Sequence, residues 1–247
     1  PMRILLTYDQ DPECGLVGFA EAVTRDPFFL IGSEPRPDFQ LADLMTLRLG
    51  AVSEVPTPWL CLQDDLRRAG LDPAAVDRVS DRTMAENAAA LRVGDLDVVQ
   101  LYEPYAEALL GAGVGHIWYA AAARGPTAYT TLFATAATLA SKPEIALAMT
   151  RALYRTQKWL HGAPPRTIAA TVGSYFPDLA PATLAAAIGR YKGLGIWGRN
   201  PILPRDGFER LKAACLSGGL IRRGAAYEDC VDTSLAQSVI DADPPSM

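Results

Sequence analysis

Apolar runs of four to seven residues, each bounded by proline, glycine or polar residues, recur along the first half of the chain. Short runs of this kind, rich in leucine, isoleucine, valine and phenylalanine, predict buried strands. A later run rich in threonine and aromatic residues favours a strand as well. The predicted strands are residues 3–7, 28–31, 47–52, 98–101, 116–119 and 129–135.

Helical patterns lie between these strands. Residues 59–69 predict one helix, for which Thr57 is a good N-cap and Pro58 suits the first helical position. Thr83 and Glu86 match a capping box, in which each side chain satisfies a backbone donor of the other residue. Because strands and helices alternate, this half of the chain predicts an α/β domain with a parallel sheet.

The second half of the chain is mostly helical. Ser141 and Glu144 match a second capping box, and apolar residues continue at helical spacing to about His161. Two further helices are expected at residues 181–191 and 204–216.

The segment of residues 92–107 carries the clearest candidate for function. Gly94 suits a helix end, because glycine adopts the left-handed conformation without a steric clash. A short strand follows, and Glu103 with the next proline ends it and starts a helix. Glu103 and Tyr105 are therefore expected at the carboxyl end of a strand, where open α/β sheets bind ligands. The spacing is equally compatible with a helix-starting Glu103 carboxylate that only faces water.

The composition is ordinary for a globular protein, with 49% hydrophobic and 21% charged residues. A net charge of −5 and the lack of a basic stripe argue against a nucleic-acid partner. The apolar runs are too short to cross a bilayer, and no signal-peptide pattern opens the chain. Because Pro1 is not a natural start, we expect that a preceding segment was removed.

Cysteine and histidine spacing predicts no metal site. The four cysteines are scattered and only two histidines are present, which is not the pattern of structural zinc. Cys61 and Cys215 fall in helical patterns and are expected to be small core residues, and the spacing leaves a disulfide open. His161 falls at a helix end, where a cation is favoured without any catalytic role.

Motifs for the common chemistries are absent. The chain has no GxGxxG dinucleotide motif after a strand, no phosphate-binding Walker loop, no GxSxG elbow and no HExxH. We therefore predict no catalytic residue and no cofactor, and we do not expect an enzyme. An α/β framework with so few candidate catalytic side chains favours a binding function over an enzymatic one.

Two tracts carry more specific information, GDLDVVQLYEPY at residues 94–105 and YEDCVDTS at residues 227–234. Together with RDPFFLIG, LADLMTLRLGAVS and YFPDLAPATLAAAIGRYKGLGIW, they resemble substrate-binding proteins of ABC importers. The branch is the SsuA/ThiY-like one, for nitrate, sulfonate, taurine and thiamine-pyrimidine precursors. The resemblance runs from about Phe19 to Gln237.

The resemblance implies a type II periplasmic-binding-protein fold, with two α/β lobes, two crossing strands and the ligand in the cleft between lobes. Residues 1–39 would hold a remnant of lobe I and the first crossing strand, and residues 40–123 would form lobe II. Residues 124–247 would hold the return strand and the C-terminal helical part of lobe I.

One departure from the family pattern concerns the N-terminus. Such proteins usually begin with a further βαβαβ unit of about half a lobe, which this sequence lacks. We expect either a truncated chain or a reduced first lobe. The unpaired sheet edge that this leaves would be covered by a partner chain or a dimer.

The resemblance also implies which residues contact a ligand. Backbone amides at Thr57 and Thr83 would hold acceptor groups, and Glu103 would accept a hydrogen bond from an N–H donor. Trp59 or Tyr105 would stack on a flat ring, although core packing explains either aromatic residue as well. The expected ligand residues are Ser53, Thr57, Trp59, Thr83, Met84, Glu103, Tyr105, Tyr129, Thr130 and Arg124.

The charge of these residues bears on the ligand. The Glu103 carboxylate would repel a sulfonate or nitrate, which favours a neutral or cationic heterocycle such as a pyrimidine. Arg124 could reverse this preference by clamping an anion. The expected partners are this small molecule and an ABC permease, and the resemblance implies a periplasmic or extracytoplasmic location.

Two other functions stay open. The first is an enzyme on the same fold, either pyrimidine-synthase-like or from the menaquinone pathway. The synthase carries a cysteine-rich motif that is not visible here, and a menaquinone-pathway enzyme would need an acid or base, for which Glu103 is the candidate. The second is a ligand-sensing domain that never meets a transporter.

Overall fold

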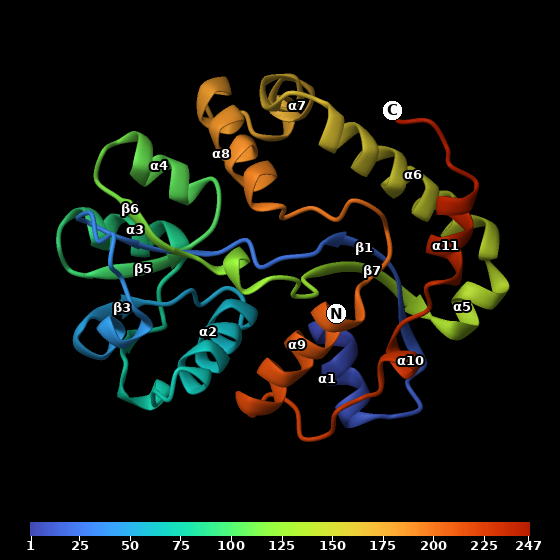
Figure 1. Cartoon of the computed structure of the whole chain (residues 1–247), viewed down its shortest axis with the longest axis horizontal. Helices are drawn as coiled ribbons and strands as arrows, with labels where there is room; N and C mark the ends of the chain where they lie inside the picture. The colour runs from blue at the N-terminus through green and yellow to red at the C-terminus, as the bar shows by residue number, and fades with distance from the viewer. The chain divides into compact units, whose positions relative to one another are not determined.

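The computed structural model describes all residues from Pro1 to Met247. The chain divides into two compact units, each built from separate segments (Figure 1). Unit 1 contains Pro1–Asp26, Arg124–Pro164 and Lys192–Met247, and unit 2 contains Pro27–Ala123 and Pro165–Tyr191. Compared with the predicted ranges, residues 27–39 and 165–191 join residues 40–123 in one unit.

Unit 2 is built on a five-stranded sheet with the order β4-β3-β5-β2-β6. β3 pairs in parallel with both β4 and β5, whereas β2 runs antiparallel to β5 and β6. The prediction of an all-parallel sheet was therefore wrong for β2, which follows β1 with no helix between them. The strands are β2 (Phe29–Gly32), β3 (Arg48–Gly50), β4 (Asp77–Val79), β5 (Val98–Leu101) and β6 (His116–Ala120).

Helices follow three of these strands, as the alternating pattern predicted. The capping box at Thr83 is confirmed: its hydroxyl accepts from the Glu86 amide, and the Glu86 carboxylate accepts from the Thr83 amide. Thr57 is not the N-cap of its helix, because the first helical hydrogen bond runs from the Leu60 amide to Pro56. The helices of unit 2 include α2 (Thr57–Arg68), α3 (Met84–Arg92), α4 (Tyr105–Gly111) and α7 (Pro165–Val172), with short 3₁₀ turns at η1 (Leu41–Thr46), η2 (Pro73–Ala75) and η4 (Gly173–Tyr175). The 3₁₀ turn η3 (Ala121–Arg124) crosses the boundary between the units, because Arg124 belongs to unit 1.

The core of unit 2 lies between the sheet and its covering helices. Leu30, Leu49 and Val98 come from three neighbouring strands and are at most 1% exposed. They pack with Leu62 and Leu66 of α2 in one apolar cluster. Burial of aliphatic side chains from both layers holds the helix against the sheet.

Unit 1 contains a two-stranded antiparallel sheet of β1 (Leu16–Val23) and β7 (Thr130–Thr135). The predicted strand at residues 3–7 is a helix instead, α1 (Met2–Gln10), which packs against α9 and β1. A five-residue apolar run is compatible with either a strand or a helix, and the tertiary packing that buries it decides which of the two forms. Here Ile4 and Leu5 are buried in the core of unit 1, at 1% and 0% exposure.

Helices supply the rest of unit 1. The second predicted capping box does not form, because Ser141 ends α5 and its hydroxyl donates to the Thr138 carbonyl at 3.2 Å. Thr135 caps α5 instead, and α6 begins at Pro143 without a side-chain cap. These helices are α5 (Ala136–Ser141), α6 (Pro143–Gly162), α9 (Arg205–Ser217), α10 (Tyr227–Cys230) and α11 (Ser234–Asp241); the boundary between the units falls inside α8 (Pro181–Leu194).

The cysteines and His161 occupy places of the predicted kind. Cys61 and Cys215 are buried core residues, as expected, and all four cysteines are free thiols. His161 lies in the last turn of α6, where its Nε2 atom is 3.1 Å from the Gly198 carbonyl. None of the helices combines the length and the apolar character needed to cross a membrane.

β1 carries a carboxylic acid into the interior of unit 1. Glu21 is 1% exposed, and neither of its carboxylate oxygens meets a donor in good hydrogen-bonding geometry. Burial raises the pKa of Glu21 to about 8, and the nearby Thr24 hydroxyl and Pro1 amino group oppose that rise only in part. Glu21 is therefore largely protonated at neutral pH, because an ionised form would lose its hydration.

Replacing Glu21 with glutamine is expected to flatten the pH dependence of stability. The folded-state pKa of about 8 lies above the ordinary value of 4.5, so the folded protein keeps a proton that the unfolded chain has released. The free energy of unfolding of the wild type should then decrease as the pH rises from 4.5 to about 8, by at most about 1.4 kcal/mol per pH unit. Urea unfolding across this range measures the difference between wild type and Glu21→Gln. The same change at the exposed Glu13 is the control, and parallel wild-type and Glu21→Gln curves would contradict the assignment.

Candidate functional site

Three parallel strands of unit 2 bring their carboxyl ends to one edge of the sheet. Residues 51–56 follow β3, residues 80–83 follow β4, and residues 102–104 follow β5. Each loop leads into the N-terminus of a helix, α2, α3 or α4 respectively. We call these three loops, with the first residues of their helices, the strand-end edge. It contains seven of the ten ligand residues expected from the sequence: Ser53, Thr57, Trp59, Thr83, Met84, Glu103 and Tyr105.

Hydrogen bonds tie the first two loops of the strand-end edge to each other. The Ala51 amide donates to the Val79 carbonyl at 2.8 Å, and the Ser53 amide donates to the Arg82 carbonyl at 3.3 Å. The buried Asn87 of α3 donates to the Ala51 carbonyl at 3.2 Å. The loops after β3 and β4 are therefore held in a fixed relation before any ligand binds.

Two carboxylates already accept hydrogen bonds from backbone amides at the N-terminus of α3. The Thr83 amide donates to the Glu86 carboxylate at 2.7 Å, within the capping box. The Met84 amide donates to the Glu54 carboxylate at 3.0 Å. Helix N-termini attract negative charge, and in this structure the protein's own acids supply it. The role predicted for the Thr83 amide, that of holding a ligand acceptor, stays a prediction that requires Glu86 to move.

Glu103 is buried and paired within unit 2. Its side chain is 4% exposed and forms an ion pair with Arg190 of α8, which also reaches the Glu107 carboxylate at 2.6 Å. Its second oxygen accepts from the Glu107 amide at 2.9 Å. Burial raises the pKa of Glu103, and the Arg190 guanidinium opposes this rise. The sequence analysis expected Glu103 to accept a hydrogen bond from a ligand. In the structure its carboxylate accepts instead from the Arg190 guanidinium and the Glu107 backbone amide.

Tyr191 fixes the backbone beside this ion pair. Its hydroxyl accepts a hydrogen bond from the Glu103 amide at 2.9 Å and donates to the Pro27 carbonyl at 3.1 Å. One phenol thus joins the end of β5 to the segment that enters β2. Because α8 supplies both Arg190 and Tyr191, this helix positions the third loop of the strand-end edge.

Aromatic rings at the strand-end edge differ in their surroundings. The partly buried Trp59 packs against the core of unit 2, and the Arg78 guanidinium lies 4.5 Å from its ring centroid. Tyr105 lies edge-on to Tyr102, with their ring centroids 6.4 Å apart. Tyr102 in turn contacts Phe28, at 5.0 Å between ring centroids. Core packing thus accounts for Trp59, while the two tyrosines form a half-buried aromatic pair beside the third loop.

The three remaining sequence-predicted residues belong to unit 1. Arg124 forms an ion pair with Asp26 at 2.5 Å, and the two side chains are 6% and 0% exposed. Its guanidinium thus has an internal carboxylate partner, which weakens the suggested role as an anion clamp. Tyr129 is half-buried, its amide donates to the Val23 carbonyl at 3.1 Å, and Thr130 is exposed at the start of β7.

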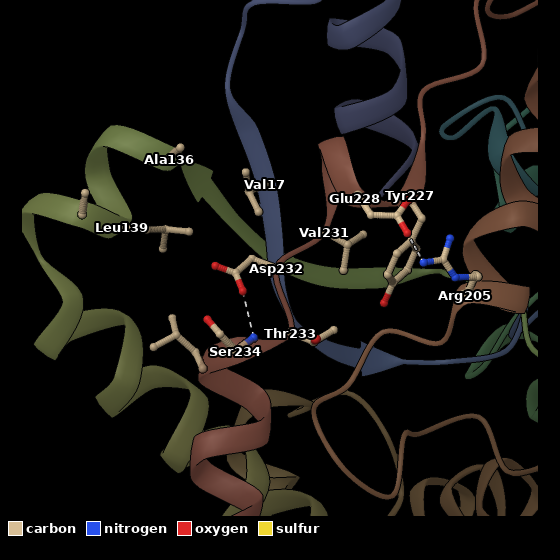
Figure 2. Close-up of a pocket in the computed structure, with 12 residues that line it drawn as sticks. Val17, Ala136, Leu139, Arg205, Tyr227, Glu228, Val231, Asp232, Thr233 and Ser234 are labelled. Carbon is tan, nitrogen blue, oxygen red and sulfur yellow. Dashed lines mark hydrogen bonds and ion pairs between the residues drawn. The ribbon is translucent and has the colours of Figure 1, made fainter.

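Unit 1 has a surface pocket of its own, with a volume of about 910 Å³ (Figure 2). Arg205 pairs with Glu228 and lies over the Tyr227 ring at 4.4 Å, and the Ser234 amide donates to Asp232 at 2.8 Å. Arg205 thus has the Glu228 carboxylate as a partner, Asp232 leaves the lining with one excess negative charge, and none of the expected ligand residues lines this pocket. Its lining is Val17, Ala136, Leu139, Ala140, Arg205, Tyr227, Glu228, Val231, Asp232, Thr233, Ser234 and Leu235.

A family model described as NMT1-like matches residues 37–173, more than half of the chain and the whole strand-end edge. The chain belongs to the NMT1-like family. It is also 25% identical over 226 residues to a Bacillus subtilis (strain 168) protein named "Putative binding protein YtlA". That alignment covers 91% of this chain and 68% of YtlA.

Solved structures place this NMT1-like protein in the periplasmic-binding-protein fold. The periplasmic aliphatic sulphonate binding protein SsuA from Escherichia coli matches with a TM-score of 0.68 and 17% identity, over 90% of this chain and 74% of SsuA. The desulfurization enzyme DszB matches with a TM-score of 0.64 and 15% identity, over 96% of this chain and 82% of DszB. The sequence-based recognition of an ABC substrate-binding-protein fold is confirmed, and the same fold also supports an enzyme.

Sequence reasoning missed three residues of the strand-end edge and its support. Glu54 and Tyr102 lie within the predicted loops, next to residues that were singled out, so loop position was the available signal. Arg190 lies 87 residues after Glu103 in the chain, and no local pattern links the two. Only the packing of α8 brings this arginine to the end of β5.

Replacing Arg190 with alanine is expected to destabilise the protein by about 3 kcal/mol at pH 8, because it leaves the Glu103 carboxylate buried and unpaired. Without the guanidinium the pKa of Glu103 rises further, so the loss should shrink at pH 5, where Glu103 takes up a proton. Chemical unfolding at the two pH values measures the effect. Arg67→Ala, which removes an exposed arginine of α2, is the control, and equal effects of the two substitutions would contradict the buried-pair interpretation.

Proposed function

We propose that this protein is a solute-binding protein that captures a small polar or heterocyclic molecule and delivers it to an ABC importer. The observation that carries the proposal is the strand-end edge, where three loops and three helix N-termini converge. Membership of the NMT1-like family and the fold shared with SsuA support it. Ligands of open α/β sheets bind at the carboxyl ends of the strands, which is where the sequence-predicted residues of unit 2 gather.

The proposed ligand contacts follow from the exposure of each group. Ser53 is exposed and Thr57 half-exposed, so both side chains are available to a polar ligand. Tyr105 offers a half-buried ring beside Tyr102, which suits a flat heterocycle. Glu103 acts by ordering the third loop through Arg190 rather than as a free acceptor.

The other proposed contacts have weaker support. Trp59 and Met84 lie at the same edge but are partly and fully buried, so their contribution is the shape of the surface. Tyr129, Thr130 and Arg124 belong to unit 1, and their assignment rests on the family resemblance. The same resemblance supports an extracytoplasmic location and an ABC permease as partner.

An enzyme is the second candidate, because DszB shares the fold. Glu103 would be the acid or base of such an enzyme, and its raised pKa fits that role. Its ion pair with Arg190 and its burial argue for a structural role instead. A sensing domain would bind ligand in the same way as a carrier and would differ only in its partner.

Native mass spectrometry of the gently purified protein tests the proposal directly. A carrier is expected to show a small molecule bound one-to-one, or to be stabilised by a member of a solute panel in a thermal-shift screen. Stabilisation should reach about 2.7 kcal/mol at a hundredfold excess of free ligand over its Kd. Tyr105→Ala should weaken this shift, whereas Tyr175→Ala, which removes a highly exposed ring elsewhere in unit 2, should not.

The fate of the stabilising molecule separates the two candidate functions. A carrier leaves the molecule unchanged after prolonged incubation, and an enzyme consumes it. The absence of both a bound molecule and any stabilising solute would count against the carrier.

A further inference from the structure

The surface pocket of unit 1 lies at one end of the β1–β7 sheet, where β7 ends and β1 begins (Figure 2). Val17, near the start of β1, and Ala136, the first residue of α5, both line it. The opposite end of β1 is Val23, and the chain leaves unit 1 after Asp26. The pocket is therefore built by unit 1 alone, and it shares no residue with the strand-end edge of unit 2.

Aliphatic side chains form most of the pocket wall. Ala136, Leu139 and Ala140 lie on one face of α5, and Leu139 and Leu235 also pack against the buried Phe19 of β1. This packing holds the wall in place without a ligand. A volume of about 910 Å³ with a largely apolar lining is typical of sites for small molecules. The aliphatic lining residues are Val17, Ala136, Leu139, Ala140, Val231 and Leu235.

The charged groups at one end of the pocket are paired with each other. The Arg205 guanidinium forms an ion pair with Glu228 and lies 4.4 Å from the Tyr227 ring centroid. The Tyr227 hydroxyl donates to the Leu203 carbonyl at 2.5 Å, which fixes the ring. This end therefore offers an aromatic ring and a compensated ion pair, but no uncommitted charge.

Asp232 is the only charged residue of the lining without a partner of opposite charge. Its backbone amide donates to the Gly18 carbonyl of β1 at 3.0 Å, and one carboxylate oxygen accepts from the Ser234 amide at 2.8 Å. The other oxygen has no partner in the protein and points toward the side of the pocket that Leu139 lines (Figure 2). The carboxylate is thus held in position before any ligand binds.

This carboxylate determines the charge of a suitable ligand. Hydrogen bonding to the N-terminus of α11 uses one oxygen of Asp232, and the second remains a charged acceptor beside an aliphatic wall. A cation placed there gains both a charge-assisted hydrogen bond and apolar contacts. An anion of the same shape would be repelled by Asp232, and Arg205 would not offset this repulsion because Glu228 already pairs with it.

We propose that the unit 1 pocket is a second binding site, for a small organic cation with an ammonium group and an aliphatic body. The ammonium group donates to the free Asp232 oxygen and to the adjacent Ser234 hydroxyl. The aliphatic body lies against Leu139 and its neighbours on the pocket wall. This inference goes beyond the proposed carrier function and does not depend on it, because the carrier ligand is assigned to unit 2.

Nuclear magnetic resonance titration of the ¹⁵N-labelled whole chain with two probes of equal chain length tests the proposal. The probes are n-hexylammonium and hexanoate, which differ in the sign of their charge, in an amine-free phosphate buffer. The cation should cause saturable shifts at the amides of Asp232, Ser234 and Leu139. Hexanoate should bind about tenfold or more weakly, in the range expected of one hydrogen bond between charged groups.

Two variants separate the charge from the wall. Asp232→Asn should weaken hexylammonium binding about tenfold or more, and it preserves the fold because asparagine serves a helix N-terminus as well as aspartate does. Ala140→Phe should weaken both probes, because its ring fills part of the pocket while Asp232 stays unchanged. Asp241→Asn is the matched control: it removes the same charge from the last residue of α11, outside the pocket, and should leave the affinity unchanged.

Three outcomes would overturn the inference. The first is equal affinity of the wild type for the two probes, which needs no variant. The second is hexylammonium binding that is insensitive to Asp232→Asn. The third is the absence of saturable shifts, or shifts confined to residues outside the pocket. None of these outcomes touches the carrier function, which native mass spectrometry and Tyr105→Ala test in unit 2.

Discussion

The parallel pairing of β3 with both β4 and β5 is the constraint on which the architecture of unit 2 depends. It forces the three following loops to one edge and directs three helix N-termini toward it. The close approach of α3 to β3 maintains this arrangement, because a Cβ atom at Gly50 would lie 2.7 Å from the Asn87 side-chain oxygen. Only glycine leaves room there for the buried amide that ties α3 to the Ala51 carbonyl.

Burial decides how each carboxylate of this protein is used. Glu103 and Asp26 are buried, and each has an arginine partner that offsets the cost of removing the charge from water. Glu21 is buried without such a partner, and it is protonated instead. Glu54 is exposed, and its carboxylate accepts a hydrogen bond from the Met84 amide at 3.0 Å.

The fold alone does not decide between a carrier and an enzyme. SsuA and DszB have different activities on one architecture, and this chain matches both with similar TM-scores. What distinguishes such proteins is the set of side chains at the strand ends. In this protein that set includes carboxylates, an aromatic pair and arginines that are already paired.

Sequence patterns were sufficient wherever a structure depends on neighbours in the chain. The capping box at Thr83, the strand at Val98–Leu101 and the helix that follows Glu103 all form as predicted, because their signals lie within a few residues. The local signal was misleading at Ser141, because this residue is the last residue of α5 and does not cap the next helix. It also failed at the N-terminus, where α1 packs on its neighbours and a five-residue apolar run does not show which partner will cover it.

The sequence by itself determined the family, the α/β class and the loops that form the strand-end edge. Only the tertiary structure decided which partner each carboxylate meets. The reason is that charge compensation depends on distance in space: Arg190 meets Glu103 across 87 residues of chain, and Glu54 meets Met84 across 30. Hydrogen bonds and ion pairs of this kind act over a few ångströms, so their partners are set by how the layers pack and not by spacing along the chain.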